Sequence, residues 1–144
     1  YHSNSRLSRT GTSGAAASVT TTWISQHKQT VRELTQSRLR DRESLYGEFI
    51  TEASRLAVDA VSHSLDTLEK LVILYGVLGR IRLVSSEDVL AEAEKCCRRI
   101  VELYSKPNLP MEQVGATFDP DELDPLKSFS SVCRAELLLI TGHL

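Results

Sequence analysis

Apolar residues recur with the period of an α-helix over several stretches between about residue 24 and residue 141. Between residues 45 and 60 they return every three or four positions, which places them on one side of a helix. Upstream, from Thr35 to Ser44, the apolar stripe fades and Leu39 is the only aliphatic residue. We therefore predict a first helix over residues 24–63 whose first part lacks an apolar face. Its predicted inner positions are Leu45, Phe49, Ala53, Leu56 and Ala60.

The second predicted helix, residues 66–84, is apolar on nearly every side. A helix of this kind is expected to be surrounded by other helices. Asp66 followed by Glu69 predicts a capping box at its start. Gly76 and Gly79 each cost about 1 kcal/mol relative to alanine inside a helix, so we expect a neighbouring helix to approach closely there. Its apolar residues include Leu68, Leu71, Val72, Ile73, Leu74, Tyr75, Val77, Leu78, Ile81 and Leu83.

The third predicted helix covers residues 86–105. Ser85 or Ser86 can cap its amino terminus, and Glu87 and Asp88 suit the positive end of the helix dipole. Pro107 ends the pattern, because the residue before a proline avoids helical geometry. The predicted inner face consists of Val89, Ala93, Cys96, Ile100 and Tyr104, with Leu90, Cys97 and Val101 beside them.

The last predicted helix covers residues 125–141. Asp124 is its expected N-cap, Pro125 its first residue, and Gly142 its end. Its inner face consists of Leu126, Phe129, Val132, Cys133, Leu137 and Ile140. Four helices with mostly short connections predict an all-α, antiparallel four-helix bundle, with the long first helix extending as a stalk.

The amino terminus differs in composition from the predicted bundle. Residues 1–14 are rich in Ser, Thr, Arg and Gly and have no periodicity, so we expect a disordered or vector-derived remnant. Residues 15–24 are small, apolar and β-branched, end on Trp23–Ile24, and are followed by Lys28 and Arg32. The cytosolic end of a membrane helix has this pattern; a frayed linker is the alternative. The predicted domains are residues 1–22 and a single bundle domain, residues 23–144.

A basic stretch lies in the first helix and is the best candidate for an interaction surface. Its five basic residues less the two acidic ones, Glu33 and Asp41, give a net charge of +3. Near an anionic leaflet each such charge contributes about 1 kcal/mol. A solvated helix is the ordinary alternative. Nucleic-acid binding is disfavoured because no interleaved aromatic residues or recognition helix accompany the charges. The basic residues are Lys28, Arg32, Arg38, Arg40 and Arg42.

A second candidate feature is a polar network between helices. Glu48, Glu52 and Arg55 share one stripe of the first helix, because they are spaced by four and three residues. Residues of the second and last helices are the expected partners. A di-metal bundle would need Glu-x-x-His elements, which the sequence lacks. We interpret the set as interhelical salt bridges: Glu48, Glu52, Arg55, Arg80, Arg82, Arg134 and Glu136.

The chemistry-bearing cysteines and histidines form no recognisable site. Cys96 and Cys97 are adjacent, so on a helix they point about 100° apart and do not chelate one metal together. With Cys133 they are expected to be buried small apolar residues, free in a reducing compartment. His27 and His63 are isolated from any nucleophile and orienting carboxylate. We therefore predict no catalytic residue, no cofactor and no metal ligand.

Several strings resemble a family of small bacterial proteins that has no established activity. The first is Leu45-Tyr46-Gly47-Glu48-Phe49-Ile50-Thr51-Glu52-Ala53-Ser54-Arg55-Leu56, which is similar to the family pattern LYxEFIxEASRL. Further matches are Arg80-Ile81-Arg82-Leu83-Val84-Ser85-Ser86, Asp124-Pro125-Leu126-Lys127-Ser128-Phe129 and Cys133-Arg134-Ala135-Glu136-Leu137. The resemblance covers residues 44–137. It implies an amino-terminal membrane helix followed by a basic helical stalk, and it implies no activity.

These observations favour a non-catalytic interaction or scaffolding domain on the cytosolic side of a bacterial protein that is anchored in the inner membrane. The first helix carries an apolar stripe longer than the shorter helices can cover, so we expect a homodimer or higher oligomer. An enzyme or small-ligand binder that uses buried polar residues is the alternative. Nucleic-acid binding through the basic stretch is the third reading, and the formal net charge of −2 gives it no support.

Overall fold

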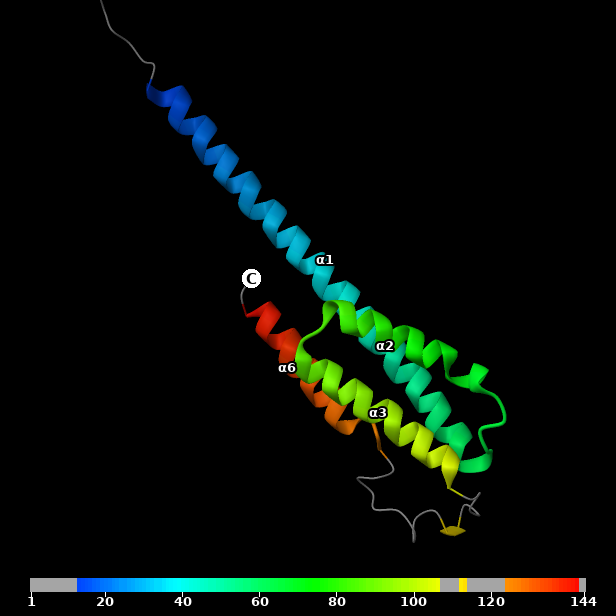
Figure 1. Ribbon diagram of the computed structural model, residues 1–144. Coiled ribbons are helices and arrows are strands. Elements are labelled where there is room, and N and C mark those ends of the chain that lie inside the picture. Colours follow the sequence, from blue (N-terminus) through cyan, green and yellow to red (C-terminus); the bar gives the residue numbers. More distant parts are fainter. Residues whose placement is uncertain (1–12, 107–111, 114–123, 143–144) are drawn as a thin grey trace, which may run out of the picture. The chain divides into compact units, whose positions relative to one another are not determined.

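The computed structural model describes residues 13–106, 112–113 and 124–142. Within these ranges the chain forms helices and no strand, so the predicted all-α class is confirmed (Figure 1). The expected disorder of residues 1–14 is wrong for residues 13 and 14, which belong to the first helix; the rest of that segment lies outside the described residues. The main elements are α1 (Ser13–Ser62), the short 3₁₀ helix η1 (Leu68–Leu71), α2 (Val72–Val84), α3 (Glu87–Ser105) and α6 (Lys127–Thr141).

Contacts divide the chain into two units, residues 1–36 and residues 37–144, and the 50-residue helix α1 contributes to both. In the first unit α1 begins at Ser13 rather than near residue 24 as predicted. The hydroxyls of Thr20, Thr21 and Thr22 each donate to the carbonyl oxygen four residues earlier, at 2.9 Å. These β-branched residues are therefore accommodated in a helix whose side chains face solvent.

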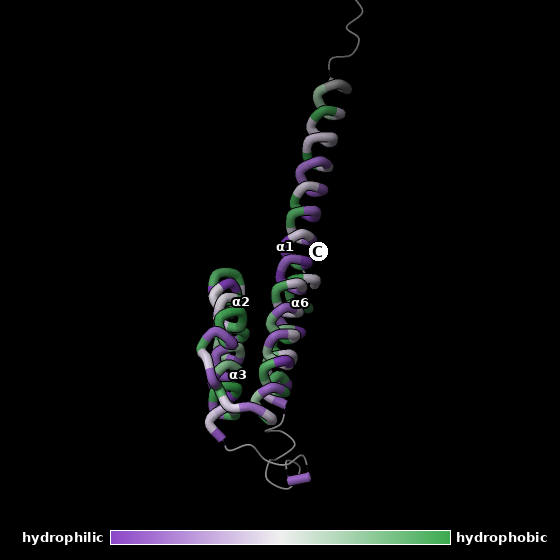
Figure 2. Tube along the Cα trace, turned by 90° about the vertical axis from the view of Figure 1, so that its right-hand side faces the viewer, coloured by the Kyte–Doolittle hydropathy of each residue, from purple (hydrophilic) through white to green (hydrophobic). Residues whose placement is uncertain are grey.

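The second unit is an antiparallel bundle of the later part of α1 with α2, α3 and α6 (Figure 1). Successive helices run in opposite directions. In the view of Figure 2, α2 and α3 form one layer, and α6 lies with α1 in the other. The predicted antiparallel bundle with a long first helix is confirmed.

The core of the bundle contains the side chains that the apolar stripes predicted. All five predicted inner residues of α1, from Leu45 to Ala60, are at most 4% exposed. Phe49 and Phe129 are fully buried, with ring centroids 4.6 Å apart, and join α1 to α6. The Tyr46 and Phe129 rings are nearly perpendicular, with centroids 6.0 Å apart. On α3, Val89, Ala93, Cys96, Cys97, Ile100 and Tyr104 are buried as predicted.

Helix starts show which capping predictions were correct. Ser86 caps α3, and its hydroxyl accepts a hydrogen bond from the Val89 N–H at 3.4 Å. The capping box at Asp66 is wrong: Thr67 is the N-cap of η1, and the Asp66 carboxylate accepts from the Thr67 N–H instead. The chain therefore enters α2 through a tighter 3₁₀ turn.

The start of the last helix also differs from its prediction. Asp124 is not the N-cap of α6, because Leu126 occupies that position; the Asp124 carboxylate instead accepts a hydrogen bond from the Leu126 N–H at 3.1 Å, within the turn before the helix. Pro125 and Leu126 form this turn, and α6 begins only at Lys127. Gly142 follows the helix as predicted, with an ordinary right-handed φ of −67°.

The environment predicted for the second helix is wrong on one side. Leu74, Val77, Leu78 and Ile81 are buried, but Val72, Ile73, Tyr75 and Leu83 are exposed. The expected close helix approach at the two glycines is also wrong, because a Cβ at Gly76 or Gly79 would meet nothing within 4 Å. In the described part of the bundle, α2 thus has neighbours on one face only.

Candidate functional site

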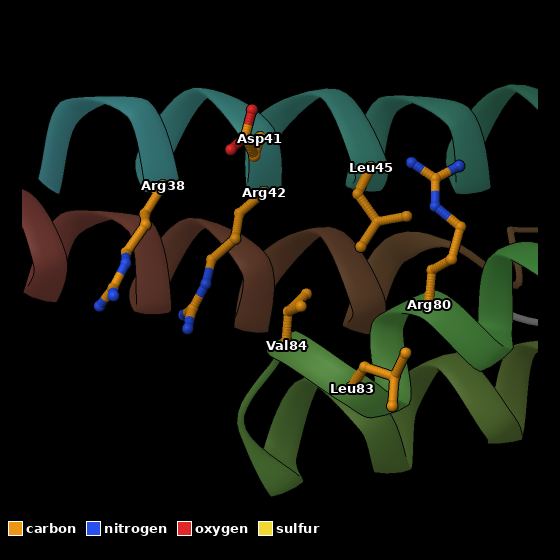
Figure 3. A pocket seen from close by; sticks show the side chains of 7 residues that line it. All are labelled: Arg38, Asp41, Arg42, Leu45, Arg80, Leu83 and Val84. Carbon is orange, nitrogen blue, oxygen red and sulfur yellow. The ribbon is translucent and has the colours of Figure 1, made fainter. Parts of the chain in front are cut away.

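A groove between α1 and the last turn of α2 is lined by four charged side chains and three apolar ones. Its volume is about 470 Å³. Arg38 and Arg42 extend from the same side of α1, and Arg80 rises from α2 toward that helix (Figure 3). The apolar wall of the groove consists of Leu45, Leu83 and Val84, and Asp41 completes its lining.

Two of the three arginines that line the groove also hold helices together. The Nη1 atom of Arg80 lies 2.5 Å from a carboxylate oxygen of Glu48, which joins α2 to α1. The Nη1 atom of Arg42 lies 3.3 Å from Glu136 on α6. Both side chains of the Glu48–Arg80 pair are about half exposed, so solvent screens their attraction. The groove therefore combines an apolar wall with positive charge that is only partly neutralised.

Glu136 is the centre of a polar cluster beside this groove. Its side chain is only 10% exposed. Besides Arg42, its carboxylate accepts hydrogen bonds from the Tyr46 hydroxyl and from the Ser86 N–H, the latter at 2.7 Å. The Ser85 hydroxyl lies 2.9 Å from the Tyr46 oxygen. One carboxylate thus connects α1, α6 and the start of α3, where negative charge also suits the helix dipole.

Burial and hydrogen bonding determine the ionisation of this cluster. Burial, followed by the hydrogen bond to Glu136, raises the pKa of Tyr46 far above its ordinary value. Tyr46 therefore remains a neutral hydrogen-bond donor, with no tendency to act as a base at physiological pH. This arrangement fastens helices and offers no nucleophile next to an activating base.

A second polar cluster lies around Asp59, where α1 approaches the end of α3. The Asp59 carboxylate accepts a hydrogen bond from the Tyr104 hydroxyl at 2.6 Å and one from Lys70 at 3.3 Å. The Nδ1 atom of His63 lies 3.2 Å from the other carboxylate oxygen, so the prediction that His63 has no carboxylate beside it is wrong. These partners, above all Tyr104, lower the pKa of Asp59, while burial raises that of Tyr104.

The lowered pKa of Asp59 predicts a specific dependence of stability on pH. A carboxyl whose folded-state pKa is depressed adds stability above its unfolded value, about 3.9, and loses it as the pH falls through the folded value. Asp59→Asn should cost about 1–2 kcal/mol at pH 7, and the difference from the wild type should shrink below about pH 4. Denaturant titrations across pH measure this; a difference constant with pH would contradict it. Asp41→Asn, on an exposed residue, is the control.

The predicted interhelical network is only partly a single assembly. Glu48 meets Arg80, and Arg82 meets Glu94 at 3.0 Å. Glu52 pairs with Arg55 within α1 at 2.7 Å rather than between helices. Arg134 is exposed and lines a shallow depression beside Tyr46 and Cys133.

Sequence reasoning missed the partners of Glu136 and the whole Asp59 cluster. The signal that could have found them was the presence of Tyr46 and Tyr104 within apolar stripes, because a buried tyrosine hydroxyl needs a hydrogen-bond partner.

The predicted basic surface divides between the two units. Lys28 and Arg32 belong to the first unit and are exposed. In the second unit Arg38 and Arg42 line the groove, while Arg40 is exposed and is not among the lining residues. Among the described residues, no helix has the length and hydropathy required to cross a membrane.

The three cysteines are free thiols buried in the bundle, as predicted. Burial raises the pKa of Cys96 and of Cys133 to about 12 and that of Cys97 to about 11. At neutral pH they are protonated and therefore poor nucleophiles and metal ligands. Among the described residues, no group of three or more His, Cys, Asp and Glu side chains is placed to hold a metal ion.

Comparison with known proteins adds no further constraint. No family model, no curated protein and no solved structure matches the chain. The similarity to a bacterial family described above therefore rests on the quoted strings of residues alone.

Proposed function

We propose that the chain is a non-catalytic helical interaction domain, on the cytosolic side of a membrane-anchored bacterial protein. The observation that carries the proposal is the apolar surface of α2, where Leu83 is 83%, Val72 65% and Ile73 60% exposed. Figure 2 shows hydrophobic residues along this helix. Burying apolar surface contributes about 25 cal/mol per Å², and contiguous apolar patches mark sites of protein association.

The composition around this surface suits a protein partner. Leu83 and Val84 belong both to α2 and to the wall of the groove, where they adjoin Arg38, Arg42 and Arg80. Protein interfaces commonly combine an apolar centre with arginine and a polar rim. A partner helix with apolar residues facing α2 and acidic residues facing the arginines would match both features.

The interior of the bundle favours this proposal over an enzyme or a small-ligand binder. The buried side chains of the described residues are aliphatic, aromatic or cysteine. A ligand site inside the bundle would require polar groups that converge in a cavity, whereas the charged pairs Glu48–Arg80 and Arg82–Glu94 lie at its surface.

Site-specific cross-linking in cells tests the proposal. A photoreactive phenylalanine analogue is introduced at Leu83 and, as a control, at Val58, an exposed position of α1 (73%). We expect a discrete protein–protein adduct from position 83 and none from position 58, because only the first lies on the proposed surface. Equal labelling at both positions, or no adduct at 83, would contradict an interaction role for α2.

The same cross-linked cells test the proposed membrane placement, which is supported by the resemblance and by the positive charges of Lys28 and Arg32. The adduct is expected in the membrane fraction of cells that express the natural gene product. Recovery only in the soluble fraction would contradict this part of the proposal and leave the interaction role standing.

A further inference from the structure

One stripe of α2 combines exposed apolar residues with two glycines. Val72, Gly76, Gly79 and Leu83 are spaced by four, three and four residues, so they lie in one row along the helix. This row points away from the buried face, which contains Leu74, Val77, Leu78 and Ile81.

The glycines of this row need an explanation that the bundle does not supply. Each costs about 1 kcal/mol relative to alanine inside a helix. A methyl group at Gly76 or Gly79 would contact nothing within 4 Å in the described part of the chain. Small residues in the middle of an apolar row allow the backbone of another helix to approach closely. The row is therefore shaped to receive a helix.

We propose that this row pairs with α2 of a second copy of the chain, antiparallel about a two-fold axis. The proposal rests on the interaction role given above and deepens it by naming the partner. The spacing of the row is symmetric about its centre. An antiparallel two-fold therefore places Gly76 of one copy opposite Gly79 of the other, and Val72 opposite Leu83. Backbones approach at the centre, and larger side chains close both ends.

The charges on α2 favour the antiparallel direction. Arg80 and Arg82 lie near the carboxyl end of α2, and Glu69 lies in η1, just before its amino end. A parallel pair would set the arginines of the two copies near one another, and their exposed ion pairs with Glu48 and Glu94 neutralise them only in part. The antiparallel pair brings Arg82 beside Tyr75 of the second copy, on the same flank of the row, where a guanidinium can pack on the aromatic face. The antiparallel arrangement also places the basic carboxyl end of α2 in one copy near the end of α2 in the other copy that follows Glu69.

The size of this surface sets the expected strength of pairing. Stable dimers bury about 1,200 Å² or more in total, and α2 has only 13 residues. We expect a weak dimer with a dissociation constant in the micromolar range, about 1–100 µM. The adjoining groove residues extend the contact area beyond the row itself.

Sedimentation equilibrium of the full chain over this concentration range tests the pairing. Leu83→Glu should weaken dimerisation by more than about tenfold, equivalent to about 1.4 kcal/mol, because the two-fold axis places two uncompensated charges in one interface. Val58→Glu is the matched control, since it adds the same charge at another exposed apolar position. Unchanged thermal unfolding and helicity at low concentration verify that both variants fold. A strictly monomeric wild type, or equal effects of the two substitutions, would overturn the proposal.

Disulfide formation tests the direction of pairing. Mixed Val72→Cys and Leu83→Cys chains should cross-link faster than either variant alone in an antiparallel pair. Val72→Cys alone should cross-link fastest in a parallel one, which would overturn the proposed arrangement. The native thiols interfere little, because they are buried and protonated.

The cross-linking of Leu83 in cells separates this inference from the proposed function. An adduct of twice the chain mass supports pairing with a second copy. An adduct with another protein, together with a monomeric chain in the centrifuge, would overturn self-pairing and leave the interaction role intact. A contact between Leu83 and another segment of the same chain would give no intermolecular adduct and would overturn both.

Discussion

Replacing Phe49 with alanine is expected to lower the free energy of unfolding by about 3–5 kcal/mol, the cost of removing a fully buried aromatic ring. Phe49 is 0% exposed and lies against Phe129, with ring centroids 4.6 Å apart. The substitution removes the main aromatic contact between α1 and α6 and leaves a cavity that the surrounding helices fill only partly. Because small domains have about 5–15 kcal/mol of stability in total, the substitution is expected to remove a large part of the stability of the bundle.

Urea titration followed by circular dichroism measures this loss. The matched control is Val58→Ala, which also shortens an apolar side chain of α1, but at a position that is 73% exposed. That variant should change the unfolding free energy by less than about 0.5 kcal/mol. A loss below about 1 kcal/mol for Phe49→Ala would mean that the aromatic contact is not part of the folded core.

Glu136→Ala should lower the free energy of unfolding by about 2–3 kcal/mol. The substitution leaves the Tyr46 hydroxyl without its carboxylate acceptor and removes the acceptor of the Ser86 N–H. It also leaves Arg42 without its ion-pair partner on α6. The cost exceeds that of a surface salt bridge because the carboxylate is nearly buried and accepts several hydrogen bonds at once.

Glu52→Ala is the matched control for Glu136→Ala, because Glu52 pairs only with Arg55 of its own helix among the interactions described. Such a pair contributes about 0.2–0.5 kcal/mol. A double-mutant cycle of Glu136→Ala with Tyr46→Phe should show a coupling energy above about 0.5 kcal/mol. If the two substitutions were additive, the short Tyr46–Glu136 contact would not contribute to stability.

The bundle was predictable because its apolar stripes are regular and uninterrupted. The spacing from Leu45 to Ala60 determines which side of α1 enters the core, whatever its neighbours are. The start of α3 was equally clear, because Ser86 caps this helix and the acidic residues after it interact favourably with the helix dipole. The predicted start of the second helix depended on a single capping signal at Asp66. The chain instead forms the 3₁₀ helix η1 there, with Thr67 as its N-cap.

The polar clusters were less predictable because they depend on how far one helix is shifted along another. Glu136 and Ser86 are 50 positions apart, and Asp59 and Tyr104 are 45 apart. Periodicity assigns each residue to a face but does not determine its height relative to a neighbouring helix. Glu48–Arg80 was anticipated as a candidate pair because opposite charges lay on facing stripes, whereas the partners of Tyr46 required the three-dimensional register.

The surface of α2 could not be assigned from composition. A helix that is apolar all round has the same sequence pattern whether its own chain or another molecule covers the second face. Here Leu74 and Ile81 enter the core, while Val72 and Leu83 remain exposed. Only the coordinates separate the two groups.

The reactivity of the three buried thiols can report transient opening of the bundle. Cys96 and Cys97 lie on α3 and Cys133 on α6, all shielded from reagents while these helices remain packed. Alkylation of a protonated, enclosed sulfur has to wait for the helices to separate. The rate at which iodoacetamide alkylates the native chain, measured by mass spectrometry, therefore reports how often α3 and α6 separate. The measurement needs no dye, label or engineered residue.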